Sequence, residues 1–289
     1  MALAGLALAA GIALAPRAGT GPGAQARTPA KPWLPPLKRP GAVVWAVGDG
    51  ADGGNPGQAL GAMLASNRID RFLYLGDVYE TGTEAEFNSN YAPAFGSLAP
   101  ITAPTIGNHE YANRAGGYLP YWQRVRGRMP PPWYAISASG WQLISLDSNA
   151  ERGAGSPQVL WLARKLRRSP RFGSCRIAFM HHPRYSAGLH GDDATMTTLW
   201  ESLAGRASLL LTGHDHDYQR FLPLNGLTEI VAGSGGHSSY PVRADSRLAF
   251  ADAADTGGVR IKLRDRVAAL RFVAADGRTL DSSEVSCTR

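Results

Sequence analysis

Cysteine is scarce in this chain, since Cys175 and Cys287 are the only two among 289 residues. Two interpretations stay open. In an exported protein the two thiols are expected to form a disulfide, which would tether the C-terminal end to the segment leading into His181. In a reducing compartment they would be two separate thiols. Export and the disulfide are therefore linked predictions.

Acidic residues are absent before Asp49, and this absence changes the meaning of the net charge. The chain carries 30 Lys and Arg against 23 Asp and Glu, a formal charge of +7. Five of the seven excess charges stand in the acid-free leading segment, at Arg17, Arg27, Lys31, Lys38 and Arg39. A nucleic-acid-binding protein would instead cluster basic residues on its folded elements, interleaved with aromatics. The charge distribution argues against nucleic-acid binding.

Long apolar runs are also missing, because none reaches the ~20 residues that a membrane-spanning helix needs. The Ala- and Leu-rich run over residues 2–15 has the length of a signal-peptide core, and Ala24-Gln25-Ala26 has the form of a cleavage site. Basic residues do not precede the run, and a flexible Ala/Gly tail is the alternative. We predict a signal peptide over residues 1–26, a Pro-rich linker over 27–40 and a folded domain over 41–289. This organisation predicts export to the periplasm or the medium, without a stable membrane span.

Strand-like and helix-like patterns alternate along the predicted domain. We expect helices over residues 58–66 and 81–90, from Pro157 onward with Ser156 as the N-cap, and over 197–203. We expect strands over residues 42–47, 71–75, 103–106, 176–180, 208–211, 228–232, 259–263 and 267–273, and a hairpin over 133–136 and 141–146. This alternation, followed by a β-rich tail, predicts an α/β fold of two packed mixed β-sheets flanked by helices.

Five short motifs place metal-binding side chains directly after strand-like runs. They are Gly48-Asp49, Gly76-Asp77, Gly107-Asn108-His109-Glu110, His181-His182-Pro183 and Gly213-His214-Asp215-His216. Oxygen ligands combined with imidazoles suit a pair of divalent or trivalent metal ions. In α/β sheets, ligands collect in the crevice beyond the carboxyl ends of the strands. One Gly-Asp pair is usually a turn, but five motifs in this order predict a shared metal site.

The ordered motifs resemble those of the calcineurin-like metallophosphoesterases and are most similar to those of the purple acid phosphatase branch. The resemblance extends from about Val43 to Leu280. It implies the four-layer sandwich of that superfamily, two metal ions (iron, manganese or zinc) and a metal-dependent phosphatase activity. By the same resemblance, Asp77 would bridge the ions. The remaining ligands would be Asp49 and His216 for the first ion, and Asn108, His181 and His214 for the second.

Three histidines are interpreted through the same resemblance. His181 is preferred over His182 as the ligand, because the family's ligand precedes the proline by two positions, as His181 precedes Pro183. His109 would hydrogen-bond the phosphoryl group or the leaving oxygen. His190 stands nine residues after His181, a spacing like that of a substrate-side histidine in the small purple phosphatases. The alternative for His190 is a surface histidine.

The first metal lacks an obvious third protein ligand. The residues after Asp49 are Gly50 and Ala51, so the Asp-x-His pattern of most of the superfamily is missing. The purple branch uses a tyrosine three residues after the bridging aspartate, whereas this chain has its tyrosine at position 79, two residues after Asp77. We expect Tyr79 to take that place, with Glu80, Asp52 or water as the alternatives. A phenolate ligand would favour ferric iron, and its absence would favour manganese, zinc or ferrous iron.

These residues permit ester hydrolysis by metal-bound hydroxide. Two clustered ions neutralise the phosphoryl oxygens and lower the pKa of a bound water to roughly 7. His109, helped by His190, would protonate the leaving alkoxide. The predicted function is an exported, acid-phosphatase-like phosphomonoesterase acting on small phosphate esters. A phosphodiesterase or nucleotidase is one alternative, and a non-catalytic metal- or phosphate-binding protein on a decayed phosphatase scaffold is another.

Three further features have both a structural and a functional interpretation. Arg220 would pair with Asp217 as a brace behind the last motif, or simply cap a strand. The glycine-rich segment over residues 233–237 would approach phosphate through its N–H groups, or would be a tight turn. The aromatic stretch that includes Tyr111, Tyr118, Tyr121 and Trp122 would pack in the core, or would stack on an aromatic leaving group.

Overall fold

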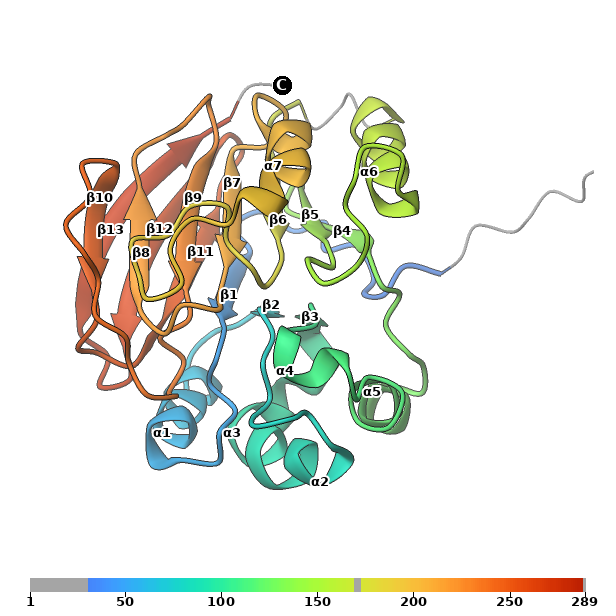
Figure 1. Cartoon of the computed structure of the whole chain (residues 1–289), viewed down its shortest axis with the longest axis vertical. Helices are drawn as coiled ribbons and strands as arrows, with labels where there is room; N and C mark the ends of the chain where they lie inside the picture. Colours follow the sequence, from blue (N-terminus) through green and yellow to red (C-terminus); the bar gives the residue numbers. More distant parts are fainter. Residues whose placement is uncertain (1–30, 169–172, 288–289) are drawn as a thin grey trace, which may run out of the picture. The chain divides into compact units, whose positions relative to one another are not determined.

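Six strands form the first sheet of the computed structural model, which describes residues 31–168 and 173–287 (Figure 1). They are β1 (Val43–Val47), β2 (Arg71–Tyr74), β3 (Thr102–Pro104), β11 (Gly257–Leu263), β12 (Val267–Ala274) and β13 (Thr279–Ser286). Their order is β13-β12-β11-β1-β2-β3. The pairs β1–β2 and β2–β3 are parallel, and the other pairs are antiparallel. β1 is central, so all five of its residues are buried.

Seven strands form the second sheet. They are β4 (Tyr134–Ala138), β5 (Trp141–Ser145), β6 (Arg176–Phe179), β7 (Leu209–Thr212), β8 (Tyr218–Phe221), β9 (Thr228–Ala232) and β10 (Leu248–Asp252). Their order is β10-β8-β9-β7-β6-β5-β4, with β5, β6, β7 and β9 parallel to one another. The two sheets pack face to face. Tyr218 of the second sheet, for example, stacks on Phe272 of the first, with ring centroids 4.1 Å apart.

Helices cover the outer faces of the sheets. They are α1 (Asn55–Ala65), α2 (Glu84–Glu86), α3 (Ala92–Phe95), α4 (Asn108–Tyr111), α5 (Tyr118–Arg126), α6 (Pro157–Arg168) and α7 (Thr197–Leu203). In Figure 1, α6 and α7 lie at the top and α1 to α5 at the bottom. Leu162 of α6 and Leu199 of α7 share an apolar cluster with Leu210 of β7. The predicted fold class, two mixed sheets flanked by helices, is confirmed. Within the described ranges, no helix combines the length and the apolarity needed to cross a membrane.

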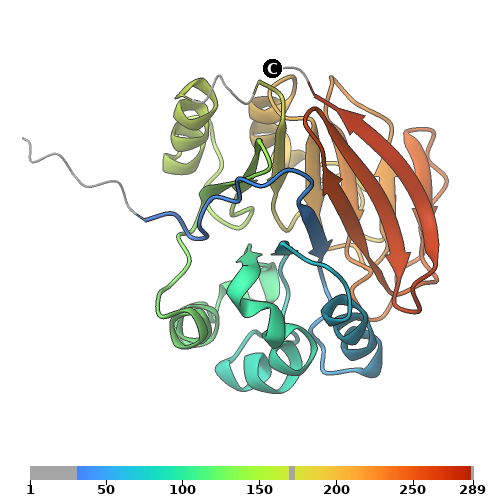
Figure 2. The same cartoon turned by 180° about the vertical axis from the view of Figure 1, so that it is seen from behind.

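Local sequence patterns predicted the buried strands better than the edge strands. The hairpin expected over residues 133–146 is present as the antiparallel pair β4–β5, and α7 has the expected bounds. The strands β8, β10 and β13 were not predicted. Two of these, β10 and β13, are the outermost strands of their sheets (Figure 2). The strand β13 also has several exposed polar residues. Tyr118, Tyr121 and Trp122 are buried on α5, which agrees with the core interpretation of the aromatic stretch.

The segment before Gly41 is more structured than the predicted linker over residues 27–40. Trp33 and Leu34 are each 1% exposed, and the Trp33 indole donates a 2.9 Å hydrogen bond to the Thr102 carbonyl. Leu37 forms a β-bridge with Ala138. The proline content suggested a linker, but the two large apolar side chains of Trp33 and Leu34 are buried in the core. The predicted signal peptide over residues 1–26 lies outside the described residues.

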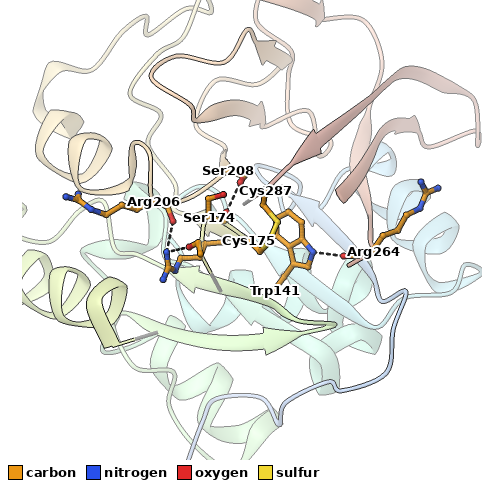
Figure 3. The surroundings of a disulfide bond; sticks show 9 residues. Trp141, Ser174, Cys175, Arg206, Ser208, Arg264 and Cys287 are labelled. Atoms are coloured by element: carbon orange, nitrogen blue, oxygen red, sulfur yellow. Dashed lines mark hydrogen bonds between the residues drawn. A yellow bond between two sulfur atoms is a disulfide. The ribbon is translucent and has the colours of Figure 1, made fainter. Parts of the chain in front are cut away.

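Cys175 and Cys287 form a disulfide, as expected for an exported chain (Figure 3). Both residues are buried, and the bond joins the start of β6 to the segment after β13 across 112 residues of sequence. Around it, the Trp141 indole donates to the Arg264 carbonyl at 2.8 Å, and Ser208 Oγ donates to the Ser174 carbonyl at 2.6 Å. The bond therefore connects the two sheets at a dry, ordered position.

Removing this disulfide is expected to lower the free energy of unfolding. The cross-link restricts the unfolded chain over a long loop, so replacing both cysteines by serine should destabilise the protein by about 2–4 kcal/mol. Urea unfolding of the oxidised wild type and of the double variant measures the difference. The reduced wild type is the control, because it should unfold like the variant. An unchanged midpoint in the variant would contradict the prediction.

A polar contact also links the sheets, and it corrects the expected pairing of Arg220. Arg220 of β8 pairs with Asp281 of β13 through two bonds of 2.7 and 2.9 Å, and not with Asp217. The Tyr218 hydroxyl donates to the same carboxylate at 3.0 Å. The sequence could not reveal this pair, because Asp281 lies 61 residues away on a strand of the other sheet.

Replacing Asp281 by Asn is expected to reduce stability in a pH-dependent way. Burial raises the pKa of Asp281, but the Arg220 and Tyr218 bonds outweigh it and hold the pKa below its usual value. The carboxylate therefore stabilises the fold above its unfolded-state pKa of ~3.9 and loses this effect as pH falls through the lowered pKa. Asp281→Asn should cost about 1.5–3 kcal/mol at pH 7, the range of bonds to charged groups. Thermal unfolding at several pH values should show this cost shrinking in acid; a constant difference would refute the assignment.

Candidate metal centre

The side chains predicted as metal ligands meet at the carboxyl ends of parallel strands from both sheets. Asp49 follows β1, Asp77 follows β2 and Asn108 follows β3 in the first sheet. In the second sheet, His181 follows β6, while His214 and His216 follow β7. The end of β1 is joined to the second sheet by the Gly48 N–H, which donates to the Ala232 carbonyl at 2.9 Å. The strand ends that carry these residues in the two sheets therefore lie next to each other.

Sharp left-handed turns bring three of these side chains inward. Asp49, Asp77 and His214 have φ values of 59°, 67° and 74°, a region that non-glycine residues adopt at a cost. The surrounding bonds hold these turns. The His214 N–H donates to Asp49 Oδ2 at 2.9 Å, and the Asp49 N–H donates to the Gly76 carbonyl at 3.1 Å. Such strained residues cluster at functional sites.

Two of the motif glycines are required by close approach. A Cβ atom at position 107 would stand 1.9 Å from Asp77 Oδ1, and one at position 213 would stand 2.4 Å from Asp49 Oδ2. Any side chain there would push a carboxylate away from the cluster. The Gly-x spacing of the motifs therefore has a steric reason beyond the turn itself.

Asp49, Asp77 and His181 offer ligand atoms within 4.8 Å of one another, and all three side chains are buried. His181 Nε2 lies 3.4 Å from Asp77 Oδ2 and 2.9 Å from Asn108 Oδ1. The opposite ring nitrogen, Nδ1, lies 2.9 Å from the carbonyl oxygen of Leu75. A carbonyl can only accept, so Nδ1 carries the proton and Nε2 faces the ligand oxygens. This arrangement is the usual way in which a protein orients a metal-binding imidazole.

His216 is oriented in the same manner, and Tyr79 lies beside it. Nδ1 of His216 donates to the Ser238 carbonyl at 2.8 Å. The Tyr79 hydroxyl lies 2.8 Å from His216 Nε2 and donates to Asp49 Oδ1 at 2.9 Å. Asp52, one of the alternatives to Tyr79 as a ligand, instead contacts His237 Nδ1 at 3.2 Å. The Tyr79 phenol is therefore the group that contacts both Asp49 and His216.

His182 lies closer to the cluster than the motif alone indicated. His181, His182 and His214 form a second group with ligand atoms within 4.8 Å of one another. Nδ1 of His182 lies 2.8 Å from Ser148 Oγ, and its ring centroid is 4.4 Å from that of His214. The residue was set aside on spacing, and the structure places it against a predicted ligand.

The two buried carboxylates lie close together at a place that is suited to a cation. Burial raises the pKa of Asp49 well above its usual value, and the charge of Asp77 adds to this effect. Burial also raises the pKa of Asp77, but His181 outweighs it and holds the pKa below the usual range. In the described part of the chain, the ion-pair partners of these two carboxylates are histidines only. Two buried anions without Lys or Arg are a poor arrangement unless metal ions compensate them.

The imidazoles are suited to metal binding. Burial lowers the pKa of His214, and it lowers the pKa of His216 to about 4, so both rings are neutral near pH 7. For His181 burial also lowers the pKa, but Asp77 and Asp49 raise it to about 10, so a proton occupies the place where a cation would sit. Burial raises the pKa of the Tyr79 phenol far above its usual value. The residues present therefore fit hard or borderline metal ions.

The two predicted catalytic histidines both lie beside the cluster. His109 is the second residue of the short helix α4. Its Nε2 is 3.8 Å from Asp77 Oδ2, and its Nδ1 lies 2.6 Å from the Glu80 carbonyl. The His190 ring stacks on His214 with centroids 4.2 Å apart, and its Nδ1 lies 2.8 Å from Asp215 Oδ1. Both rings are partly exposed, with side-chain exposures of 31% and 41%. They can therefore meet a ligand that reaches the cluster from solvent.

Two buried glutamates that were given no role hold the ligand loops. Glu110 accepts hydrogen bonds from the backbone N–H groups of Asp77, Val78 and Gly107, at 3.2, 3.1 and 2.8 Å. Burial raises its pKa to about 7. The signal for it was present, since Glu110 ends the Gly-Asn-His-Glu motif.

Glu229 of β9 plays the same part in the second sheet. It accepts from the N–H groups of Arg184 and Tyr185, at 2.9 and 3.0 Å, and so holds the loop that follows His182. Burial raises its pKa to about 8. The sequence around Glu229 reads as an ordinary strand, so its role was invisible before the structure.

The glycine-rich segment over residues 233–237 packs against the first ligand turn. The Gly235 N–H donates to the Gly48 carbonyl at 3.0 Å, and the His237 N–H donates to the Asp49 carbonyl at 3.0 Å. These N–H groups are thus used within the protein, which favours the tight-turn interpretation. The His237 ring stacks on Tyr79 with centroids 4.0 Å apart, beside a cavity of about 240 Å³.

Known structures share this fold. GAP50, the anchor in the inner membrane complex of Plasmodium, is similar over 87% of this chain and 90% of its own, with a TM-score of 0.71 and 15% identity. The purple acid phosphatase PPD1 from yellow lupin (Lupinus luteus) is similar over 88% of this chain and 55% of its own, with a TM-score of 0.69 and 18% identity. At these identities the likeness concerns the fold.

Sequence comparisons extend the likeness to the motifs. A purple acid phosphatase of Glycine max is 26% identical over 143 residues, which are 48% of this chain but only 28% of the soybean protein. Residues 33–218, which contain all the predicted metal-ligand motifs, match the calcineurin-like phosphoesterase family. The chain therefore belongs to the calcineurin-like phosphoesterases, a family of metal-dependent phosphatases, and within it is similar to the purple acid phosphatases.

Proposed function

We propose that this protein is an exported phosphomonoesterase of the acid-phosphatase type, acting on small phosphate esters at a binuclear metal centre. The observation that carries the proposal is the convergence of two buried carboxylates with His181, within 4.8 Å, at the ends of strands from both sheets. The nearby Asn108, His214, His216 and Tyr79 complete a donor set of oxygens and imidazoles. Family membership and the similarity to purple acid phosphatases support the same reaction class.

The protein side chains would divide the metal centre between them. Asp77, whose ligand atom lies within 4.8 Å of those of Asp49 and His181, would bridge two ions. Asp49, His216 and Tyr79 would hold one ion, and Asn108, His181 and His214 would hold the other. When bound, such a pair of ions neutralises the phosphoryl oxygens and activates water for attack on phosphorus.

His109 would serve the leaving group. An alkoxide leaves slowly until it gains a proton, and a positioned histidine commonly supplies one. The ring of His109 is held through Nδ1 by the Glu80 carbonyl, so Nε2 is the atom turned toward the carboxylate cluster. His109 Nε2 lies 3.8 Å from the Asp77 carboxylate, so the ring is beside the proposed metal centre, although His109 is not one of its proposed ligands.

The position of Tyr79 favours iron for one of the two ions. A phenolate bound to ferric iron produces a visible charge-transfer band, whereas manganese or zinc would leave the protein colourless. The phenol is within hydrogen-bond distance of both Asp49 and His216, its expected neighbours on the same ion. Metal analysis of the purified protein, together with a visible spectrum of wild type and Tyr79→Phe, tests this assignment. A purple wild type and a colourless variant are expected; a colourless wild type with two manganese or zinc ions would keep the phosphatase and reject the phenolate.

The reaction class is tested with two simple esters. The metal-loaded protein should hydrolyse p-nitrophenyl phosphate much faster than bis(p-nitrophenyl) phosphate. The reverse preference would favour a phosphodiesterase. No turnover of either ester by protein that holds two metal ions would favour a non-catalytic binding protein.

Export is supported by the buried Cys175–Cys287 disulfide. Disulfides of this kind form and persist in oxidising compartments such as the periplasm. Fractionation of the producing cells, with N-terminal sequencing of the mature protein, tests the proposal. An N-terminus near residue 27 in the exported fraction is expected, and full-length protein confined to the cytoplasm would contradict it.

A further inference from the structure

His190 lies on a short loop that is fastened to the last metal-ligand motif. The loop runs from Ser186 to Gly191, between β6 and α7. The side chain of His190 stacks on His214, and its ring also lies edge-on to Tyr240 at 5.5 Å. The ring is therefore fixed in orientation on two sides, although 41% of its surface is exposed.

Asp215 is the group that holds this ring. It stands between the two imidazoles of the Gly-His-x-His motif, and its side chain is fully buried. Oδ1 accepts the backbone N–H of His190 at 3.0 Å and lies 2.8 Å from the Nδ1 of the same residue. A carboxylate can only accept, so Nδ1 carries the proton. Nε2, on the other side of the ring, is left for a ligand.

The second oxygen of Asp215 is held as firmly as the first. Oδ2 accepts a short hydrogen bond from Ser186 Oγ. That hydroxyl oxygen in turn accepts the Gly188 N–H and one amide proton of Gln219, both at 2.9 Å. The amide oxygen of Gln219 accepts the Ala187 N–H at 2.7 Å. The carboxylate thus has no freedom to turn away from His190.

Steric packing adds to this constraint. A Cβ atom at position 188 would lie 2.6 Å from Asp215 Cγ, so the loop backbone rests directly on the carboxylate. Among the described residues, His190 is the ion-pair partner of Asp215. Fastening a loop requires only the backbone N–H bonds. The additional bond to Nδ1 acts on the ring alone, and this bond points to a role in positioning.

We propose that Asp215 is a positioning residue for the phosphatase reaction, which sets the tautomer and direction of His190 so that Nε2 meets the leaving oxygen of the ester. This inference rests on the proposed function. In the step it serves, His190 acts as the imidazolium: the N–H bond at Nε2 breaks, an O–H bond forms on the leaving oxygen, and the ring is left as the neutral Nδ1–H tautomer that Asp215 holds. His190 thereby shares with His109 the protonation of the leaving group. The substrate that benefits is a phosphate ester with a poor leaving group, such as an alkyl phosphate.

The test compares Asp215→Asn, His190→Ala and the double variant on a series of phosphate esters with good and poor leaving groups. Asn keeps the size of the side chain and can still contact Ser186, so the loop should remain folded. Each single variant should lower kcat about 10- to 100-fold for an alkyl phosphate, the usual range for residues that orient a functional group. Turnover of p-nitrophenyl phosphate should fall less, because its leaving group needs a proton less, and KM and metal content should change little. The double variant should be no worse than His190→Ala alone.

Asp217→Asn is the matched control. Asp217 is buried in the same polar cluster and accepts from Gln219 at 2.8 Å, but it makes no bond to His190. The control should therefore keep the leaving-group dependence of the wild type. Multiplicative losses in the double variant, or equal losses for good and poor leaving groups, would assign Asp215 a merely structural role.

Nitrogen NMR of the histidine rings provides a readout that is independent of activity. The His190 ring should be protonated at Nδ1 in the wild type and should lose this preference in Asp215→Ala. An Nε2–H tautomer in the wild type would overturn the inference. If metal-loaded wild type hydrolyses no ester at all, the proposed function fails; if it hydrolyses esters and Asp215→Asn behaves as wild type, only the positioning role fails.

Discussion

Replacing Asp77 by Ala should abolish metal binding and phosphatase activity together. Asp77 is 1% exposed, and its carboxylate approaches His181 and His109, which follow the separate strands β6 and β3. Its loss removes the only proposed bridging ligand. Charge stabilisation by a metal pair amounts to several kcal/mol, so activity should fall by roughly 10³-fold or more. Metal analysis after dialysis and turnover of p-nitrophenyl phosphate measure the two losses.

Two controls separate this effect from unfolding. Asp77→Asn keeps an oxygen that can accept the His109 N–H, a 3.1 Å bond in the wild type, so its fold should survive while it still loses metal. Asp147→Asn alters another buried aspartate, which follows β5 and accepts the N–H of Asn149 outside the cluster. That variant should keep both metals. Full metal content and activity in Asp77→Ala would disprove the site.

Replacing His109 by Ala should slow turnover while sparing the metals. The ring is anchored by the Glu80 carbonyl and is not among the close ligand groups of Asp49, Asp77 and His181. General acid catalysis contributes ~10²–10⁴-fold, and most of it should be lost for alkyl phosphates, whose leaving groups need a proton. For p-nitrophenyl phosphate the loss should be smaller, because its leaving group departs more easily.

The decisive measurement for His109 is kcat across a series of leaving groups, at equal metal content. A steeper dependence of kcat on leaving-group basicity is expected in His109→Ala than in the wild type. Normal turnover in the variant, or a parallel loss of bound metal, would remove His109 from the acid role. The same kcat series for His190→Ala then shows how much each of the two histidines contributes to protonation of the leaving group.

Strands buried on both faces were predictable, because continuous apolar runs have few alternatives. The run over residues 42–47 became β1, at the centre of its sheet. The strand β13 was not predictable, since its Thr279–Ser286 sequence is mostly polar and its strand form depends on pairing with β12. Trp33 shows the same limit. Its proline-rich surroundings predicted a linker, but the Trp33 side chain is buried in the core.

The candidate site divides in a similar way. The motif residues Asp49, Asp77 and Asn108 could be proposed from the sequence because each follows a strand-like run. The carboxyl ends of parallel strands lie at the same edge of a sheet, where ligands collect. The supporting groups were missed where they come from distant elements. Glu229 reaches the loop after His182 from another strand, and Arg220 pairs with Asp281 across the two sheets.

The order of five short motifs, by itself, indicated a shared metal site, because carboxylates, an amide and imidazoles after strands suit metal ions. The resemblance of these motifs to those of the calcineurin-like phosphoesterases implied the reaction class. Only the tertiary structure decided which atoms meet. It brought the Tyr79 phenol to Asp49 and His216 despite the altered spacing, and it joined Asp215 to His190. The physical reason is that a hydrogen bond depends on positions in space to within a fraction of an ångström, whereas residue spacing along a turn constrains those positions only to within several ångströms.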